Sequence, residues 1–479
     1  MGHFSTVLTA LMEQKKLINN EVIRYTGINR STFFKMKNGQ RPPSGPEMVE
    51  SIARAMQLSA DDRKALFSAY EIDQVGAYKY YGMEAIHRFC LSDAKISQYP
   101  VVKITIPEFG EGEHVRIFRD PSEVRAVLMG VLNETSSDIR ILEDRMSDLY
   151  KTGIPQASRA CPDKKFYHIF RMNESDKVEM DHQLYNVNCF QNAVEIVKRT
   201  DRYFPRHYYS SATAGAGGKA QSSFILSDRY LLTYSDAFSS AVLYKDPEML
   251  AFYGEIFEEA MKTSTTLLKP ASRLGIFSEE PWLELITDAE EEIYFLIPGI
   301  GSSFFRPGNE DLFRNYISDE VEGKEELIRF RFAYGVRLQN AVKQMGRSIH
   351  IISASNAVEL FARTGYINEL PRRLAVPFAE KDRADVLRKW KREAREFGMT
   401  GTREKCIPDS SAMCITATER GAFLSFLSEP GRVDARIFVT EPSIAGLIFT
   451  YLKRVAERHS MDHQEYLRFL DDLIAGLEN

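Results

Sequence analysis

Over the first 70 residues, apolar side chains recur every three or four positions, which predicts a series of short amphipathic helices. The first is expected from Phe4 to Lys16, the second from about Asn19 or Asn20 to Thr26, and the third from Arg30 to Lys37. Two more are expected at 46–56 and 60–70. Residues 1–70 are therefore predicted to form a small all-α domain.

The joint between the second and third helices is marked by its residue types. Gly27 is expected at the turn, because glycine readily adopts the left-handed conformation that a tight turn needs. Asn29 is placed to cap the third helix, which Asn38 and Gly39 are expected to end. Residues 71–101 look helical at first, and their aromatic run YKYYGMEAIHRF suits a connector that also contributes to a dimer contact.

The longer remainder of the chain contains an internal repeat. NAVEIVKRT at 192–200 and NAVELFART at 356–364 are identical at six of nine positions. In both copies a helix and a strand precede the repeated segment. Two strands follow it and lead to a closing helix, which Asp246-Pro247 introduces in one copy and Glu441-Pro442 in the other. The second copy is longer, and the charged helix around 382–397 is expected to supply the insertion.

Alternating helices and strands in two copies predict two similar α/β lobes, at 102–268 and 276–479. The predicted fold is therefore multidomain: an all-α helix-turn-helix head followed by a duplicated, two-lobed α/β region. Because ligand pockets favour domain interfaces, a cleft between the lobes is the expected place for a ligand.

The 479-residue chain has a net charge of −5, but this charge is unevenly distributed. Residues 1–70 hold ten lysines and arginines against six acids, a balance of +4, which leaves −9 for the rest of the chain. This asymmetry fits a small nucleic-acid-binding domain on an acidic body that does not itself bind DNA. Five cysteines without a CxxC pair, and the lack of a membrane-length apolar run, predict a cytoplasmic location.

The run LINNEVIRYTGINRSTFFKMKNGQRPPS resembles the XRE, or phage-repressor-like, helix-turn-helix family of transcriptional regulators, over about 70 residues. The family's turn glycine falls on Gly27 and its buried apolar positions fall on Val22, Ile28 and Phe33. Asn19 stands where the family usually has a phosphate-binding glutamine, and Ile23 departs from the usual alanine. The resemblance implies that the third helix reads the major groove of DNA.

Exposed side chains near the start of such a helix reach base edges, while flanking residues hold phosphates. Arg30 can donate two parallel hydrogen bonds to guanine, and Lys35 lies about one turn further along. Phe34 occupies a normally polar position, where it either touches a thymine methyl group or packs. The predicted DNA-binding residues are Asn19, Arg30, Ser31, Thr32, Phe34, Lys35 and Asn38.

The duplicated region resembles phospholipase-D-like lobes, which also occur as catalytically inactive sensor domains in some regulators. The enzymes of that family need an HxK motif followed by an aspartate, and none of the nine histidines here begins HxK. No catalytic residue, cofactor or metal site is therefore predicted, and the protein is expected not to be an enzyme.

Two sets of residues are candidates for ligand binding in the body. GIGSSF at 299–304 follows the apolar strand IYFLIP, the position at which α/β folds present ligand-binding loops, and it offers Gly299, Gly301, Ser302 and Ser303. Arg199 and Arg363 occupy matching positions in the repeat, where they bind an anion or form internal ion pairs.

Other motifs favour structural interpretations. The loop TAGAGGKA at 213–220 departs at both ends from a phosphate-binding loop, and Ser460 replaces the glutamate that a zinc protease would place between His459 and His463. Cys406 and Cys414 are expected to be ordinary cysteines, with a redox pair as the alternative. The stretch RKWKREARE is expected to form a solvated helix face.

The main prediction is a sequence-specific transcriptional regulator, with repression as the expected mode. It would bind a palindromic double-stranded DNA operator as a homodimer, and its duplicated region would sense an unidentified small molecule or protein. Two alternatives stay open: an enzyme acting on a nucleotide or phosphoester with a DNA-binding head, and a protein-sensing regulator of prophage or defence genes.

Overall fold

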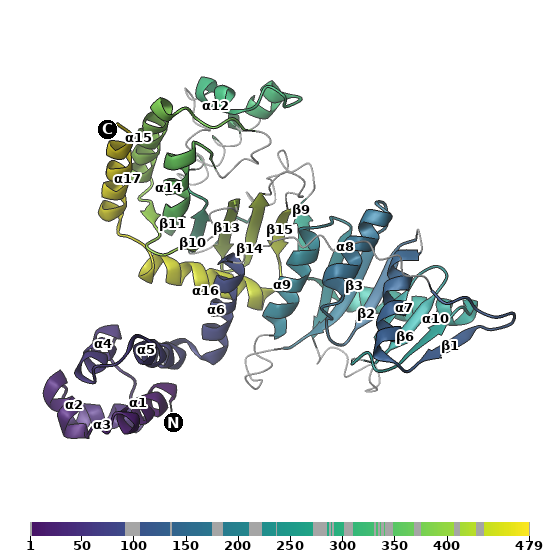
Figure 1. Ribbon diagram of the computed structural model, residues 1–479, viewed down its shortest axis with the longest axis horizontal. Helices are drawn as coiled ribbons and strands as arrows, with labels where there is room; N and C mark the ends of the chain where they lie inside the picture. Colours follow the sequence, from purple (N-terminus) through teal and green to yellow (C-terminus); the bar gives the residue numbers. More distant parts are fainter. Residues whose placement is uncertain are drawn as a thin grey trace. The chain divides into compact units, whose positions relative to one another are not determined.

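A computed structural model describes most of the chain as two compact units, one ending at Ala85 and one beginning at Ile86 (Figure 1). The described residues are 2–91, 106–134, 137–174, 185–209, 223–235, 237–271, 285–286, 289, 292–300, 310–329, 332–333, 336, 340, 348–367, 375–406, 412–427 and 435–478.

The first unit is built from short helices around one apolar core (purple in Figure 1). They are α1 (His3–Gln14), α2 (Asn19–Thr26), α3 (Arg30–Lys37), α4 (Pro46–Ala55), α5 (Ala60–Val75) and the first part of α6 (Ala77–Leu91). The core draws Phe4 and Leu8 from α1, Phe33 and Met36 from α3, and Ile52 from α4, all buried. The apolar periodicity read from the sequence is therefore the pattern that buries one side of each helix.

The turn between α2 and α3 follows the residue types expected there. Gly27 ends α2 with a φ of 69°, in the left-handed region, and its N–H donates to the Ile23 carbonyl at 2.9 Å. The Asn29 side chain accepts a hydrogen bond from the Ser31 N–H at 2.9 Å and so caps α3. Both sequence predictions for this joint are confirmed.

Helix α5 continues past residue 70, where the sequence predicted the domain to end. Ile72 is buried and extends the helix's apolar face to Val75, after which Gly76, with a φ of 87°, separates α5 from α6. In α6, the Tyr80 hydroxyl donates to Ser68 Oγ of α5 at 2.7 Å, and Met83 is buried. The aromatic side chains expected to serve a dimer contact are thus partly used inside the chain.

The second unit is mixed α/β and holds two sheets. In lobe 1 the strands run in the order β1-β7-β6-β5-β2-β3-β4-β8. Their bounds are β1 (Val115–Phe118), β2 (Ile139–Glu143), β3 (Phe166–Met172), β4 (Tyr203–Tyr209), β5 (Ser223–Leu226), β6 (Leu231–Tyr234), β7 (Ala241–Tyr244) and β8 (Thr265–Thr266). Its helices are α7 (Pro121–Glu134), α8 (Tyr150–Ala160), α9 (Tyr185–Val197) and α10 (Pro247–Thr263).

In lobe 2 the order is β12-β11-β10-β13-β14-β15-β9. The strands are β9 (Leu268–Ala271), β10 (Glu292–Ile297), β11 (Ser348–Ser353), β12 (Thr400–Gly401), β13 (Ala412–Thr418), β14 (Gly421–Leu427) and β15 (Ala435–Val439). The helices include α12 (Glu310–Tyr316), α14 (Ser355–Thr364), α15 (Glu380–Glu396), α16 (Pro442–Arg458) and α17 (His463–Glu478). Leu268, predicted as the last residue of lobe 1, is instead the first residue of an edge strand of lobe 2.

Both sheets share one topology. Read from β4, lobe 1 runs β4-β3-β2-β5-β6-β7-β1, and lobe 2 runs β12-β11-β10-β13-β14-β15-β9 in the same positions. In each, three parallel strands are followed by antiparallel ones. This shared order agrees with the internal repeat in the sequence. Helix α15 lies between α14 and β12, where lobe 1 has no counterpart, so it supplies the predicted insertion.

The acid-proline pairs start the closing helices in both lobes. Asp246 accepts from the backbone N–H groups of Glu248 and Met249 at the start of α10. Glu441 accepts in the same way from Ser443 and Ile444 at the start of α16. Among the described residues, no helix is both long enough and apolar enough to cross a membrane.

Candidate functional site

Helix α3 presents a polar outer face on a buried inner one. Phe33 and Met36 are buried in the core of the first unit, which fixes how the helix is turned about its axis. Arg30, Ser31 and Lys35 consequently lie exposed on the other side. Asn38 is also exposed and follows the helix as its C-terminal cap, whereas Thr32 is half-buried.

Phe34 supports Arg30. Its half-buried ring meets the edge of Phe33, with the ring centroids 6.4 Å apart, and the Arg30 guanidinium lies 5.8 Å from the Phe34 centroid. A cation over an aromatic face is held by the ring's quadrupole. Phe34 therefore packs against Phe33 and restrains the Arg30 side chain.

The charges on α3 are not neutralised by the protein. Among the described residues, no carboxylate pairs with Arg30, Lys35 or Arg41. By contrast, Arg54 and Arg63 both pair with Glu50, at 2.7 and 2.6 Å. Arg30, Lys35 and Arg41 are therefore available to an external anion, whereas Arg54 of α4 and Arg63 of α5 are engaged internally.

Two side chains at the ends of α2 and α3 are joined. The Lys37 ammonium donates to Asn19 Oδ1 at 2.9 Å, linking the first residue of α2 to the last residue of α3. The segment after α3 folds back, since the N–H groups of Gln40 and Arg41 both donate to the Lys35 carbonyl. These two bonds hold the exposed Arg41 next to α3. Arg41 was not among the DNA-binding residues predicted from the sequence, although it follows the end of α3 closely.

The predicted ligand loop of lobe 2 is only partly described, because Gly301, Ser302 and Ser303 lie outside the described residues. Gly299 is buried with a φ of 84°, and a Cβ there would meet the Ala357 carbonyl carbon of α14 at 3.1 Å. The Ser353 hydroxyl donates to the Gly299 carbonyl at 3.3 Å. Glycine is needed at position 299 because the segment that follows β10 packs closely against α14.

The repeated arginines lie in different environments. Arg199 donates to the Lys151 carbonyl at 3.2 Å and lies 3.8 Å from the Glu195 carboxylate, which matches the ion-pair alternative. Arg363 is exposed near the end of α14, and its carbonyl accepts from Arg383. No described contact joins the two arginines in one site.

The remaining sequence motifs are accounted for by packing where they are described. His459 Nδ1 lies 3.3 Å from Glu404, and His463 Nδ1 lies 2.8 Å from the Met399 carbonyl oxygen. Cys406 is buried and Cys414 half-buried, and no disulfide joins them. Within the described ranges, no cluster of three or more metal-ligating side chains is present. The loop at 213–220 lies outside the described residues.

The basic stretch at 388–396 belongs to α15. Trp390 is buried, while Lys391 pairs with Asp471 of α17 and Arg388 with Asp385. The stretch thus lies partly in the core and partly at the surface, and two of its five cations pair with carboxylates.

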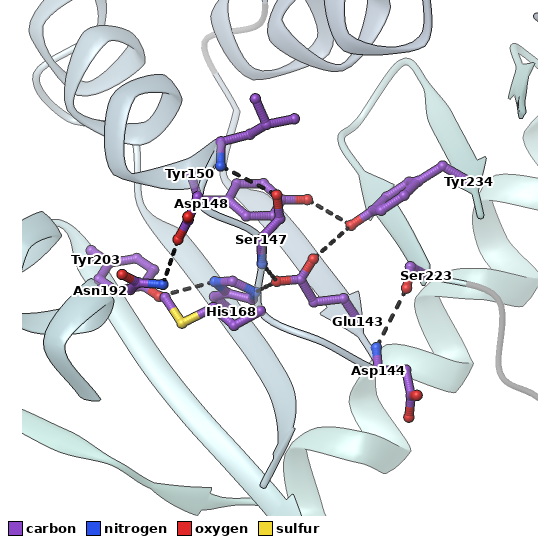
Figure 2. Close-up of polar contacts among 12 residues, drawn as sticks. Glu143, Asp144, Ser147, Asp148, Tyr150, His168, Asn192, Tyr203, Ser223 and Tyr234 are labelled. Atoms are coloured by element: carbon purple, nitrogen blue, oxygen red, sulfur yellow. Dashed lines mark hydrogen bonds and ion pairs between the residues drawn. The ribbon is translucent and has the colours of Figure 1, made fainter. Parts of the chain in front are cut away.

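Lobe 1 contains a buried polar cluster that the sequence prediction missed (Figure 2). Glu143, the last residue of β2, accepts from His168 of β3, with Oε1 and Nε2 2.9 Å apart. The Ser147 N–H donates to the same oxygen at 2.9 Å, and the Tyr234 hydroxyl donates to the other at 3.2 Å. Glu143 is 2% exposed and His168 is 0% exposed, so water does not reach either group.

Tyrosine hydroxyls extend the cluster at both ends. Tyr203 Oη lies 2.9 Å from His168 Nδ1, and Tyr150 Oη lies 2.6 Å from Tyr234 Oη. Burial, followed by the nearby Glu143 carboxylate, raises the pKa of Tyr203 well above its usual value. Burial likewise raises the pKa of Tyr150 and Tyr234, so all three hydroxyls stay protonated and can donate. The only sequence signals for this cluster were single ionisable residues inside two apolar strands.

The same strand positions in lobe 2 are apolar. The register of β10 with β13 and β11 places Ile297 where lobe 1 has Glu143, and Ile351 where lobe 1 has His168. The shared topology is therefore compatible with an apolar pair at these positions.

No protein-family model and no curated protein sequence matches the chain. Similar solved structures include TrmBL2, described as an archaeal chromatin protein with a novel mode of DNA binding. It matches at 15% identity and a TM-score of 0.24, and the match covers 47% of this chain and 73% of that one. NucT from Helicobacter pylori matches at 9% identity and a TM-score of 0.25, covering 32% of this chain and 98% of that one. Nuc from Salmonella typhimurium, a phospholipase D family member, matches at 10% identity and a TM-score of 0.24, covering 32% of this chain and 96% of that one. At these TM-scores the similarities carry no argument about function.

Proposed function

We propose that the protein is a sequence-specific DNA-binding regulator, with α2 and α3 as its helix-turn-helix. The observation that supports this most is the outer face of α3, where Arg30 and Lys35 are exposed and lack carboxylate partners among the described residues. An N-capped helix with unpaired cations at both ends of its exposed face suits the major groove.

In this proposal, residues divide by the part of DNA that they contact. Arg30, restrained by Phe34, reads guanine, while Ser31 and Lys35 reach neighbouring bases. Asn19, Lys37 and the exposed Arg41 contact phosphates, because they flank the face of α3 and carry donors. Thr32 and Asn38 lie at the margin of this surface.

The α/β region is proposed to respond to a ligand or partner and to pass that change along α6. Helix α6 begins in the first unit, and its Phe89 contacts Phe190 of α9 in lobe 1 and Phe426 of β14 in lobe 2. A change in how the lobes pack would therefore shift the end of a helix that is continuous with the DNA-binding unit.

The proposal is tested by selecting preferred DNA sequences with the full-length protein and with Arg30→Ala and Lys35→Ala. Each variant should bind the selected sequence about 5- to 150-fold more weakly and lose preference at one position, as expected for a lost base contact. Arg54→Ala removes an equal charge from a side chain already paired with Glu50, so it should keep the preference.

Asn19→Ala separates phosphate contacts from base contacts. It should weaken binding to selected and unrelated sequences alike, because phosphate contacts carry no direct sequence information. If Arg30→Ala and Lys35→Ala retain the parental preference while circular dichroism shows an intact fold, α3 is not the reading helix.

A further inference from the structure

Three large apolar side chains are exposed at one corner of lobe 1. Val115 and Ile117 of β1 are 45% and 60% exposed, and Phe252 of α10 is 56% exposed. Strand β1 is the last in the order of its sheet, so one of its edges has no strand beside it among the described residues. An exposed apolar edge strand readily pairs with another chain.

These side chains share one face of lobe 1. Val115 and Ile117 lie opposite Tyr244 and Val242 of β7, and directly opposed residues in antiparallel strands point to the same face. Tyr244 belongs to the cluster that packs against α10, so this is the α10 side of the sheet.

Phe252 lies on the flank of α10 nearer β1. A Cβ on Gly254 would point toward Leu226 of β5 and Arg140 of β2. Phe252 is two residues away, which is about 200° around the helix axis, and so it points to the opposite flank. Val115, Ile117 and Phe252 together form what we call the β1/α10 patch.

The internal repeat identifies the surface of lobe 2 that is equivalent to the β1/α10 patch. By register, Val115 corresponds to Leu268 of β9, because these residues pair with Tyr244 and Val439 at equivalent places. Counting from the caps Asp246 and Glu441, Phe252 corresponds to Leu447 of α16. Leu268 is 1% exposed and Leu447 is 2% exposed. Strand β9 and helix α16 contact β4 and α9 of lobe 1, so this surface of the repeat is covered in one copy and open in the other.

A second chain cannot repeat this arrangement head to tail. The lobe 2 counterparts of β4 and α9 are β12 and α14, and these contact α15 and α17. Trp390 and Tyr466 are buried there, with Trp390 Nε1 donating to the Tyr466 hydroxyl at 2.9 Å. That surface is occupied by the chain's own helices. A contact between two copies of the patch avoids it and gives a closed two-fold dimer.

We propose that the β1/α10 patch binds the same patch of a second copy of this chain, with the two β1 strands antiparallel and centred on Arg116. This register sets Val115 against Ile117 of the second copy. It also brings Glu113, just before one strand, near Arg119, just after the other, so opposite charges meet twice. The two Arg116 side chains face each other at the centre, and each is neutralised by Glu113 of its own chain. Glu113 stays ionised to low pH, because its hydrogen bonds from Arg116 lower its pKa to about 2.

This contact would supply the second DNA-binding unit that a palindromic operator requires, and in that respect it rests on the proposed function. The interface itself does not depend on DNA. Its test therefore uses the full-length protein without DNA, so that a failure here and a failure of the DNA-binding proposal are seen in different experiments.

Sedimentation equilibrium of the full-length protein should show a dimer, and Ile117→Lys should raise its dissociation constant by at least about tenfold, as loss of a central interface residue does. Val376→Lys is the matched control, because Val376 is 46% exposed in lobe 2 and its substitution should leave the dimer intact. A full-length protein that stays monomeric at all concentrations, or a dimer that survives Ile117→Lys, overturns the proposal.

A second measurement tests the register. Residues directly opposite in antiparallel strands have Cα atoms about 4.5–5.5 Å apart, within disulfide range. Arg116→Cys should therefore form a disulfide-linked dimer with oxidised glutathione, each new bond releasing two protons and two electrons to the glutathione disulfide. The parental protein under the same conditions controls for the natural cysteines. A dimer that does not crosslink through this residue excludes antiparallel pairing centred on Arg116.

Discussion

The two lobes have one strand order and different interiors. Lobe 1 buries the Glu143–His168 pair with three tyrosines, whereas lobe 2 has Ile297 and Ile351 at the same two positions. Burying polar and ionisable groups costs free energy unless hydrogen bonds to other buried groups replace those to water. Since both lobes have the same strand order, this fold does not require a polar pair at these positions.

The lobes also differ at the carboxyl ends of their parallel strands. In lobe 2, Tyr466 of α17 packs against Gly401 at the end of β12, and Trp390 of α15 bonds to its hydroxyl. In lobe 1, the polar cluster begins at the end of β2, and no helix equivalent to α15 or α17 is present among the described residues. Helices α15 and α17 thus pack with large side chains at this end of lobe 2. Lobe 1 has buried polar groups at the end of β2.

The largest expected effect comes from removing one member of the pair. His168→Ile removes the His168 bond to the buried Glu143, which keeps its bonds from Ser147 and Tyr234, and it also removes the contact with the Tyr203 hydroxyl. Breaking a buried pair by removing one partner costs about 3–5 kcal/mol. Both tryptophans, Trp282 and Trp390, lie in the lobe 2 segment. Urea unfolding should therefore move to lower denaturant by circular dichroism, with a smaller change in tryptophan fluorescence.

Ile351→Val is the control for this first experiment. It trims one methylene at the matching position of lobe 2 and should cost about 0.5–1.5 kcal/mol. Equal effects of His168→Ile and Ile351→Val would mean that the polar pair contributes no more than a packed side chain.

The helix caps offer a second, intermediate comparison. Asp246→Ala should cost about 0.5–2 kcal/mol, the usual loss for an N-cap. Glu441 is fully buried and also accepts from the Tyr209 hydroxyl of lobe 1, so Glu441→Ala removes a further hydrogen bond and should cost about 1–3 kcal/mol more. Thermal unfolding of both variants measures the difference. If the two losses are equal, the Tyr209 contact contributes nothing to stability.

The smallest effect is expected from converting lobe 1 to the composition of lobe 2. Glu143→Ile with His168→Ile and Tyr203→Phe removes both ionisable side chains and the hydroxyl that contacts His168. Of the two other groups that bond to Glu143, Tyr234 keeps its contact with Tyr150, and Ser147 is only half-buried. Replacing both partners of a buried hydrogen bond by apolar groups of similar shape can be nearly neutral, so urea unfolding should lie within about 1 kcal/mol of the parental protein. A loss as large as that of His168→Ile alone would show that lobe 1 needs the polar groups to fold.

The sequence predicted those features that single residues or repeats specify. Gly27 and Asn29 specified the joint of α2 and α3 because their chemistry acts locally, and the repeated segment NAVE predicted two similar α/β lobes. Glu143 and His168 were missed because their pairing depends on two adjacent strands, and 25 residues separate them in the chain. The edge strands β1 and β9 were missed because four residues give too little alternation to recognise.

The DNA-binding candidates divide in a similar way. Arg30, Ser31 and Lys35 follow from helical spacing once Phe33 and Met36 face the core. The role of Phe34 under Arg30 and the folding back of Arg41 depend on side-chain and loop geometry that spacing alone does not give. Gly299 was predicted to contact a ligand, yet the approach of Ala357 already requires a glycine there.

Burial of the cysteines affects the protein's resistance to oxidants. Burial raises the pKa of Cys189 to about 12 and that of Cys406 to about 11, and it also raises the pKa of Cys90. Because the thiolate is the reactive form, these three thiols stay protonated and inert at neutral pH. Oxidative damage would therefore begin at the half-buried Cys161 and Cys414, leaving the packing around α6 and α9 chemically protected.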